Sequence, residues 1–478
     1  MQHFDVAVIG SGSGNSLIDE RFDGLHVALI DDHEEFGGTC LNRGCIPTKM
    51  FVLPADYAVS PEDAGRLGVD LRFEGADWPA IRDRIFGRID PISVGGLDWR
   101  LRSDNVTVFR AHTSFIDEHT LQVGEDRISA DQIVIATGSR PRLIGVDVPD
   151  DLTDRIHTSD DIMRIDALPR RLVILGAGFI AAEFAHIFSA LGTEVTIINR
   201  SEVVLRDEDE EISHAFAEQI SHRVKLRLNQ QVDTIEHGPA DDVQVVTTDR
   251  NGVEYVYFAD AVLVATGRVR NSEALNLAAA GVEVREGGQI RVDAQQRTSV
   301  GHIWAMGDVS SDYLLKHVAN AEMRTVQHNL VSSESAWVET DHRYVPHAVF
   351  THPQIASVGA TEQQLRDWGT PYVVARQRYS DVAYGWAMED QGHFVKLLAD
   401  PRNWRLLGAH ILGPQASTLI QPLIQAMSFG LSVPDMARGQ YWIHPSLPEV
   451  VENALLGLMA NKKRAELDAG VHVPGPVT

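Results

Sequence analysis

The sequence is poor in cysteine, in positive charge and in long apolar runs. Only two cysteines, Cys40 and Cys45, occur in 478 residues, too few for the disulfide scaffold of a secreted protein. Lysine and arginine total 42 against 67 acidic residues, a formal net charge of −25, which argues against nucleic acids and anionic membranes as partners. No apolar run reaches the length of a membrane span, and the start MQHFDVAVIG lacks the features of a secretory leader. We therefore expect a cytoplasmic protein that binds anionic ligands through local features.

Metal-binding patterns are missing as well. The 20 histidines are scattered, without a Cys-x-x-Cys set or a His-Glu-x-x-His helix, the spacings that bring zinc ligands together. The sequence therefore predicts no metal site.

The beginning of the chain carries a dinucleotide-binding pattern. The apolar run DVAVIG leads into a loop with Gly10, Gly12 and Gly14, then into a helix-length segment and the strand HVALID. In such a loop the first glycine permits a tight turn, the second lets the backbone approach a diphosphate, and the helix N-terminus supplies amide donors. Asp31, or its neighbour Asp32, ends the second strand, where an acid is placed to bind the hydroxyls of an adenosine ribose.

The same pattern recurs in a second unit. The run RLVILG leads into Gly176 and Gly178, followed by Ala181 in a helix-length segment and by the strand TEVTIIN. Arg200 and Arg206 then follow, where an acid would select an unphosphorylated ribose. Because guanidinium groups bind a 2′-phosphate in bidentate fashion, this unit is predicted to bind NADPH rather than NADH. The alternative is that both arginines are solvated surface residues.

The repeat extends beyond the glycine loops. Each unit closes with a strand and an Ala-Thr-Gly turn, which contains Gly138 in the first unit and Gly267 in the second, so two separate dinucleotides are expected. From about His347 the pattern changes to short strands and two apolar helices. We predict an α/β fold of two Rossmann-like dinucleotide-binding domains and a C-terminal α+β domain. The predicted ranges are residues 1–145 with 271–340, residues 146–270 and residues 341–478.

Both cysteines lie in the segment GGTCLNRGCIPTK. Five residues apart on an ideal helix, their Cα atoms would be roughly 8 to 9 Å apart, beyond the reach of a disulfide. A bridge therefore requires the segment to leave helical geometry, which Gly44 permits. Since so small a loop gains little stability and the cytoplasm reduces disulfides, a redox-active dithiol is favoured over two free buried cysteines. A flavin relays the hydride of a nicotinamide to such a dithiol, so one dinucleotide is predicted to be a flavin.

The dithiol segment resembles the active-site motif of the FAD-dependent pyridine nucleotide–disulfide reductases, the family of glutathione reductase and dihydrolipoamide dehydrogenase. Both glycine loops, both Ala-Thr-Gly turns, the Gly-Asp-Val motif at Asp308, HAVFTHPQIASVG and the terminal HPSLPE occur in the family's order over nearly the whole chain. The resemblance implies FAD in the first unit, NADPH in the second, and an obligate homodimer formed through a C-terminal dimerisation domain.

The resemblance also implies roles for single residues. Cys45 corresponds to the thiol beside the flavin, and Cys40 to the interchange thiol that attacks the substrate disulfide. Lys49 and Glu183, the latter in the NADPH-binding unit, correspond to an ion pair beside the flavin N5. The remaining residues that we assign to FAD are Gly38, Thr39, Gly138, Asp308, Leu314, Leu315 and His317.

His444 and Glu449 correspond to an acid–base pair that enters the active site from the other subunit. From the residues alone another role is open for Glu449, because Ser446 three residues earlier completes a capping-box pattern at the start of a helix.

Within the family, IDDHEEFGGTC, GSGSGNS and KMFVLPADYA resemble the mycothione reductases. This implies NADPH-dependent reduction of a small-molecule disulfide, mycothione. Dihydrolipoamide dehydrogenase is the alternative, and as usually an NAD enzyme it conflicts with Arg200 and Arg206. A non-catalytic flavoprotein or a thiol-based metal-binding module is the alternative from a different class.

Overall fold

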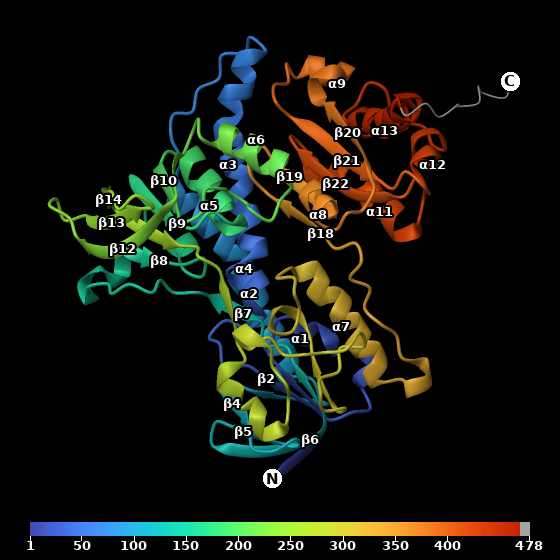
Figure 1. Ribbon diagram of the computed structural model, residues 1–478. Coiled ribbons are helices and arrows are strands. Elements are labelled where there is room, and N and C mark those ends of the chain that lie inside the picture. The colour runs from blue at the N-terminus through green and yellow to red at the C-terminus, as the bar shows by residue number, and fades with distance from the viewer. Residues whose placement is uncertain (469–478) are drawn as a thin grey trace.

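The structure, a computed structural model, describes residues 1–468 as three modules, each built on its own sheet (Figure 1). Residues 469–478, the end of the predicted third domain, lie outside the described residues. Within residues 1–468 no helix is long and apolar enough to span a membrane. Among the side chains of residues 1–462, which the structure describes, no group of three or more histidine, cysteine or acidic residues is arranged to hold a metal ion.

The N-terminal module contains a seven-stranded sheet. In spatial order its strands are β3 (Val106–Phe109), β2 (Val27–Ile30), β1 (Gln2–Ile9), β6 (Asp126–Ile135), β5 (Thr120–Val123) and β4 (Thr113–Phe115), with β17 (Ile303–Ala305) paired to β6. The pairs of β1 with β2 and β6 are parallel, and both faces of these strands are buried, so they read as apolar runs. Because the ends of β1 and β2 pair with each other, the first glycine loop and Asp31 lie at one edge of the sheet.

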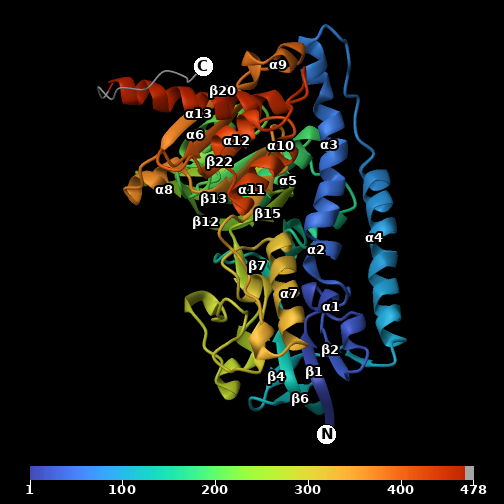
Figure 2. The ribbon, with the colours of Figure 1, turned by 90° about the vertical axis from the view of Figure 1, so that its right-hand side faces the viewer.

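Five helices belong to this module. They are α1 (Ser13–Leu17), α2 (Gly38–Asn42), α3 (Cys45–Arg66), α4 (Trp78–Leu101) and α7 (Lys316–Leu330). Figure 2 shows α3 rising from the sheet toward the other modules, with α4 beside it. An aromatic cluster holds these helices together: the ring centroids of Phe51 and Trp78 are 4.9 Å apart, and those of Trp78 and Phe188 of the second module 5.5 Å. The helix that follows the dithiol is therefore fixed to the second module.

The second module repeats the parallel arrangement. Its main sheet consists of β11 (Lys225–Leu228), β10 (Glu194–Asn199), β9 (Arg171–Leu175), β15 (Ala261–Val264) and β8 (Ile156–His157), in that spatial order. A smaller antiparallel sheet contains β12 (Gln230–His237), β13 (Val243–Asp249) and β14 (Glu254–Ala259). Its helices are α5 (Phe179–Ala190) and α6 (Glu210–Ile220). The β9–α5–β10 unit thus corresponds to β1–α1–β2.

The chain crosses between these two modules twice, at adjacent places. β7 (Ser139–Pro141) leaves the first Ala-Thr-Gly turn, β16 (Arg268–Arg270) leaves the second, and the two pair antiparallel. Asn271 fixes the crossing, because its Nδ2 donates to the Thr137 carbonyl at 3.0 Å and its own carbonyl accepts from Thr137 Oγ1 at 2.7 Å. The crossing therefore holds the ends of both modules beside each other.

The C-terminal module is a five-stranded antiparallel sheet covered by helices. The strand order is β18 (Pro346–Val349), β19 (Ile355–Gly359), β22 (Leu406–Leu412), β21 (Phe394–Ala399) and β20 (Val373–Arg378). The helices are α8 (Glu362–Asp367), α9 (Ala383–Ala387), α10 (Ala416–Leu419), α11 (Gln421–Phe429), α12 (Val433–Arg438) and α13 (Pro448–Asp468). Alternate residues face different cores: Ile411 packs within this module, whereas Leu412 joins the core shared with α5 and α6.

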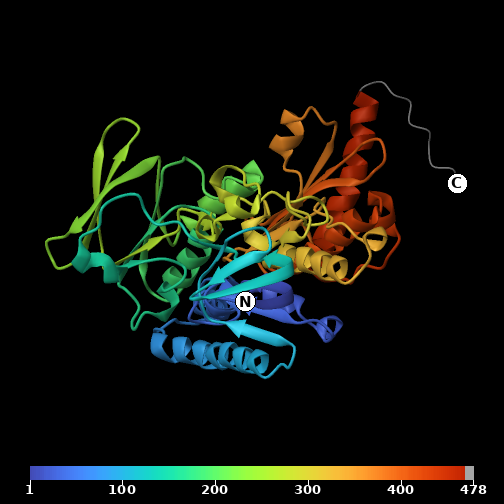
Figure 3. The ribbon, with the colours of Figure 1, turned by 90° about the horizontal axis from the view of Figure 1, so that it is seen from below.

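A buried charge cluster joins the C-terminal module to the second module. Lys396 on β21 is nearly fully buried, and its Nζ lies 2.9 Å from Asp209 and 2.5 Å from Glu362. Burial opposes the charge on Lys396, but its hydrogen bonds to these carboxylates outweigh burial and raise the pKa of the ammonium. Seen from below, the second and C-terminal modules lie on opposite sides of the molecule, with the N-terminal module between and beneath them (Figure 3). Two parallel α/β modules and an antiparallel module with helices confirm the predicted fold class.

Candidate active site

The first glycine loop is pressed against two other backbone segments. Gly10 has φ +111°, and a Cβ on it would lie 2.3 Å from the Ala136 carbonyl oxygen. A Cβ on Gly38 would lie 2.6 Å from the Cα of Gly12. Only glycine fits such contacts. They place the N-terminus of the dithiol helix α2 directly on the loop, so the dithiol and the dinucleotide site are built as one unit.

The two acids at the end of β2 have different partners. Asp31 accepts hydrogen bonds from the backbone N–H of Ser11 at 2.6 Å and of His33 at 2.8 Å, one on each carboxylate oxygen. Asp32 lies 3.1 Å from His112 Nδ1, and more than half of each side chain is exposed. Asp31 therefore stabilises the loop conformation, whereas Asp32 offers an accessible carboxylate.

The second glycine loop has the same backbone geometry as the first. Gly176 has φ +108°, and a Cβ on it would lie 2.4 Å from the Ala265 carbonyl oxygen. Gly178 is the N-cap of α5, with no described atom near the position of a Cβ, and Ala181 is fully buried behind it. The N-terminus of α5 is therefore open to a ligand.

The segment after β10 carries the two predicted phosphate-binding arginines. Asn199 Nδ2 donates to Ser201 Oγ at 2.7 Å and so fixes the start of this segment. Both arginine side chains are exposed. Among the described side chains, those of residues 1–462, Arg206 has only a long contact, 3.7 Å, with Asp207, and Arg200 forms no hydrogen bond or ion pair. Both guanidinium groups are thus accessible to an anionic ligand.

The dithiol segment leaves helical geometry between the cysteines. Cys40 lies in α2, which ends at Asn42; Arg43 has φ −152°, Gly44 is the N-cap of α3, and Cys45 is the first residue of α3. The segment therefore has the interruption that a Cys40–Cys45 bridge would require. Both cysteines are free thiols in this structure.

The two thiols have opposite acidities. The hydrogen bond from Cys40, assisted by the charge of Lys49, lowers the pKa of Cys45 to about 7. The same hydrogen bond, together with burial, raises the pKa of Cys40 above its ordinary range. Cys45 is therefore the first thiol to ionise.

Lys49 and Glu183 form an ion pair where the three modules meet. Lys49 Nζ on α3 lies 2.5 Å from Glu183 Oε2 on α5. The other oxygen, Oε1, accepts from the backbone N–H of Phe350 in the C-terminal module at 3.0 Å, and Lys49 lies over the Phe350 ring at 4.7 Å. Because the charge of Lys49 helps to lower the pKa of Cys45, this contact couples the module junction to the dithiol.

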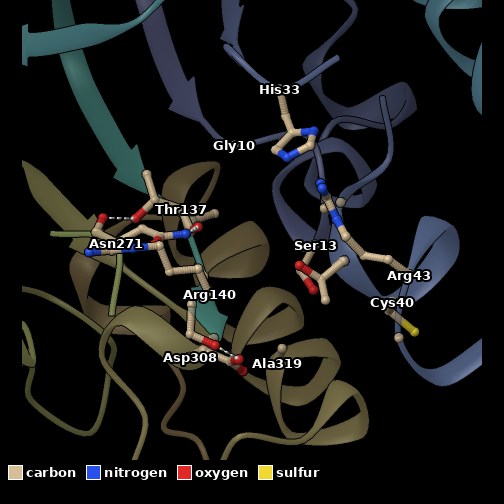
Figure 4. A pocket seen from close by; sticks show the side chains of 18 of the residues that line it. Gly10, Ser13, His33, Cys40, Arg43, Thr137, Arg140, Asn271, Asp308 and Ala319 are labelled. Atoms are coloured by element: carbon tan, nitrogen blue, oxygen red, sulfur yellow. Dashed lines mark hydrogen bonds between the residues drawn. The ribbon is translucent and has the colours of Figure 1, made fainter. Parts of the chain in front are cut away.

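A cavity of about 700 Å³ brings most of the predicted first site together (Figure 4). Its walls come from the first glycine loop, the end of β2, the dithiol segment, the crossing between modules and the start of α5 and α7. The predicted residues that line it are Gly10, Gly12, Asp31, Gly38, Thr39, Cys40, Cys45, Lys49, Gly138, Glu183, Asp308 and Leu314.

Other predicted residues lie outside this cavity. Gly14 packs against β1. Leu315 is the N-cap of α7, and the His317 ring is bonded to the Pro346 carbonyl at 2.8 Å. The second-module residues that do not line it are Gly176, Gly178, Ala181, Arg200, Arg206 and Gly267.

Several basic residues line the cavity although the sequence did not single them out. Lys316 Nζ donates to Ser13 Oγ at 2.8 Å at the first glycine loop. Arg268 Nε donates to Ser139 Oγ at 2.7 Å, and that hydroxyl donates to Asp308 Oδ2 at 2.5 Å. Besides Lys49, which the sequence did predict, the arginine and lysine residues of the lining are Arg43, Arg140, Arg268 and Lys316. Six carboxylates line the cavity as well, namely Asp31, Asp32, Asp160, Glu183, Glu273 and Asp308. The cation at the first glycine loop is Lys316, and its position there fits a diphosphate. The glycine cradle fits it as well, since added Cβ atoms would fill it.

His444 and Glu449 form a pair remote from the cavity lining. His444 Nδ1 lies 2.6 Å from Glu449 Oε1, and the other oxygen of Glu449 accepts from the Ser446 N–H at 3.1 Å. The hydrogen bond to His444 lowers the pKa of Glu449. Glu449 therefore orients the imidazole and binds the backbone just before α13, but the capping box is only half formed, because Ser446 Oγ donates to the Ile443 carbonyl at 2.6 Å. The His444 side chain is 69% exposed.

Two dinucleotide-type modules that meet at a cysteine pair define a flavin-dependent disulfide oxidoreductase. Comparison with known families agrees: residues 4–325 match the family described as pyridine nucleotide-disulphide oxidoreductase, and residues 345–455 match its dimerisation domain. The chain belongs to this family. It is an enzyme that uses FAD and a pyridine nucleotide to transfer electrons to or from a disulfide.

Individual relatives narrow the comparison. The chain is 51% identical over 475 residues to the mycothione reductase of Mycobacterium tuberculosis strain H37Rv, covering 96% of this chain and all of that protein. It is 32% identical to the dihydrolipoyl dehydrogenase of Chlamydia muridarum, covering 98% of each. Among solved structures, the HOCl-induced flavoprotein disulfide reductase RclA of Escherichia coli matches with a TM-score of 0.83 at 28% identity, over 95% of this chain and 99% of that one.

Proposed function

We propose that the protein reduces mycothione, a low-molecular-weight disulfide, with electrons from NADPH in the cytoplasm. The observation that carries the substrate is the 51% identity, over essentially full length, to a mycothione reductase. The exposed arginines after β10 support NADPH, because they provide the charge that a 2′-phosphate needs and β10 ends on Asn199 rather than on an acid.

The two dinucleotides have distinct places in this proposal. FAD occupies the first module, where the cavity is lined by glycines and cations, and NADPH occupies the second, at the open N-terminus of α5. The proposed domain ranges are residues 1–145 with 271–340, 146–270 and 341–478. Of the two acids after β2, Asp32 is the one proposed to bind the adenosine ribose, because both oxygens of Asp31 already accept backbone hydrogen bonds.

The chain's own residues perform the thiol chemistry. When bound, FAD supplies a hydride acceptor that passes two electrons from NADPH to the Cys40–Cys45 disulfide. Cys40 first gives its proton to a base, proposed to be His444 of the partner subunit. The Cys40 thiolate then attacks one sulfur of the substrate, which forms a mixed disulfide and releases the first thiol. Cys45, ionised near neutral pH, attacks the Cys40 sulfur, re-forms the internal disulfide and releases the second thiol. Each departing thiolate takes up one proton, so two electrons and two protons convert one disulfide into two thiols.

His444 is proposed to supply those protons from the partner subunit. The dimerisation-domain match supports a homodimer, and His444 is largely exposed and does not line the cavity of its own chain. Glu449 holds the Nδ1 side of the imidazole, which leaves Nε2 to face a thiol across the subunit boundary.

Dihydrolipoamide reoxidation is the second candidate. The relatives at 32% identity favour it, and the thiol chemistry is the same in reverse. The two candidate functions differ in the pyridine nucleotide. NAD has no 2′-phosphate for Arg200 and Arg206 to bind, so these arginines do not favour dihydrolipoamide reoxidation.

An NADPH oxidation assay against mycothione, glutathione disulfide, trypanothione and lipoamide tests the proposal. Mycothione is expected to give the highest kcat/KM, and the Cys40→Ser variant is expected to keep its flavin and lose this turnover. A preference for lipoamide with NADH would favour the second candidate. Turnover retained by Cys40→Ser would contradict the thiol chemistry itself.

A further inference from the structure

Arg43 lies in the middle of the dithiol segment with no adequate partner. Its side chain is 13% exposed, and its Nε is buried and forms no hydrogen bond with any side chain or backbone atom that the structure describes. The nearest carboxylate oxygen, Oε2 of Glu35, is 3.7 Å from Arg43 Nη1, too long for a hydrogen bond. A buried guanidinium donor without an acceptor is unfavourable, so a missing anion is the simplest explanation.

The position of Arg43 shows where that anion lies. Arg43 lines the same cavity as the first glycine loop, and Figure 4 shows its side chain extending from the dithiol segment to between Ser13 and His33. Ser13 begins α1 and is bonded to the ammonium of Lys316. The guanidinium therefore faces the part of the cavity where backbone amides and a second cation already favour negative charge.

We propose that Arg43 binds the diphosphate of FAD, so that the dithiol segment itself holds the cofactor. A diphosphate offers paired oxygens to the planar donor set of a guanidinium, and the buried Nε gains the acceptor that it lacks. Because Arg43 stands between Cys40 and Cys45, the same contact fixes the segment that carries both thiols. The inference depends on FAD as the cofactor, which family membership shows, and not on the identity of the disulfide.

FAD release from the holoenzyme tests this assignment. Diluted wild type, Arg43→Gln and Arg43→Lys are followed by the fluorescence of released flavin, and the dissociation constant is measured by equilibrium dialysis. Loss of a charge-assisted contact predicts roughly ten- to hundredfold weaker FAD binding in Arg43→Gln. The FAD affinity of Arg43→Lys is expected to lie between those of wild type and Arg43→Gln, since an ammonium keeps the charge without the bidentate geometry. The dependence of FAD affinity on salt is expected to be shallower in Arg43→Gln.

Arg110→Gln is the matched control. Arg110 donates to the carbonyls of His33 and Glu34 and thereby holds the neighbouring loop, but it does not line the cavity. Its FAD affinity is expected to stay within about threefold of wild type. An Arg43→Gln affinity within threefold of wild type, or equal losses in Arg43→Gln and Arg110→Gln, would overturn the proposal. Thermal unfolding of both variants checks that each folds.

Discussion

The two dinucleotide modules share a backbone and differ in their surroundings. Gly10 and Gly176 have nearly the same φ, and each presses against the carbonyl of an Ala-Thr-Gly turn at almost the same distance. The first loop, however, is also covered by α2 through Gly38 and by α7 through Lys316. At the second loop the helix N-terminus is open and the neighbouring arginines are exposed.

This difference separates a resident cofactor from an exchanging substrate. A ligand in the first module is enclosed by segments from distant parts of the chain, so its release requires several contacts to break together. A ligand in the second module meets an accessible edge and depends on a few charged side chains. The backbone repeat thus defines two dinucleotide sites, and the covering segments and the residues after the second strand decide what each site does.

Alanine at the first glycine of each loop is expected to have the largest effect. In either Gly10→Ala or Gly176→Ala the new Cβ would overlap a carbonyl oxygen, at a positive φ that by itself costs a residue with a Cβ about 1–3 kcal/mol. We expect Gly10→Ala to bind FAD more than about a hundredfold more weakly. We expect Gly176→Ala to retain its flavin but to need an NADPH concentration more than about a hundredfold higher for half-saturation. The flavin content of each purified variant measures the loss of FAD, and titration with NADPH measures the loss of NADPH affinity.

Gly65→Ala, on α3 with no described atom near its Cβ position, is the control and is expected to resemble wild type. If Gly176→Ala lost flavin as readily as Gly10→Ala, the modules would not have separate ligands.

Removal of one phosphate-binding arginine is the next largest change. Each charge-assisted contact with a 2′-phosphate contributes about 1.5–3 kcal/mol, so Arg200→Ala and Arg206→Ala are each expected to lower kcat/KM for NADPH more than tenfold and leave that for NADH nearly unchanged. Steady-state kinetics with both nucleotides measure the ratio. An unchanged ratio in Arg200→Ala would show a solvated surface arginine instead.

Lys49→Met tests how far the charge of Lys49 lowers the pKa of Cys45. A positive charge favours the thiolate, so its removal is expected to raise the pKa of Cys45 from about 7. In the reduced protein, the ultraviolet absorbance of the thiolate would then appear at higher pH than in wild type. A midpoint that stayed near 7 would mean that the Cys40 hydrogen bond alone sets the acidity.

The two acids after β2 are expected to give the smallest and most specific difference. Asp32→Asn removes one acceptor for a ribose hydroxyl, worth about 1 kcal/mol, and should weaken FAD binding about fivefold without changing the apoprotein's melting temperature. Asp31→Asn leaves the Ser11 or His33 N–H without its carboxylate acceptor and should lower that melting temperature. If Asp31→Asn weakened FAD binding and Asp32→Asn lowered the melting temperature, Asp31 would be the residue that binds the ribose.

Features set by the local backbone were predictable from the sequence. The glycines of both loops are needed wherever strand, turn and helix pack closely, and that requirement leaves a visible pattern. Helix geometry showed that a bridge between Cys40 and Cys45 would require a break in the helix, and the structure has such a break. Features set by distant segments were not predictable: which of Asp31 and Asp32 satisfies loop amides depends on their exact orientation, and Lys316 reaches Ser13 across some 300 residues.

Complementation between two inactive variants tests the central claim most directly, namely that electrons reach Cys40 within one subunit and protons come from His444 of the other. The variants His444→Ala and Cys40→Ser are mixed under conditions in which subunits exchange, and hybrid dimers are verified by mass. One of the two sites in each hybrid then contains both Cys40 and His444, so partial NADPH-dependent disulfide reduction is predicted, while both parents keep rapid flavin reduction by NADPH. Verified hybrids that remain inactive would contradict a shared active site.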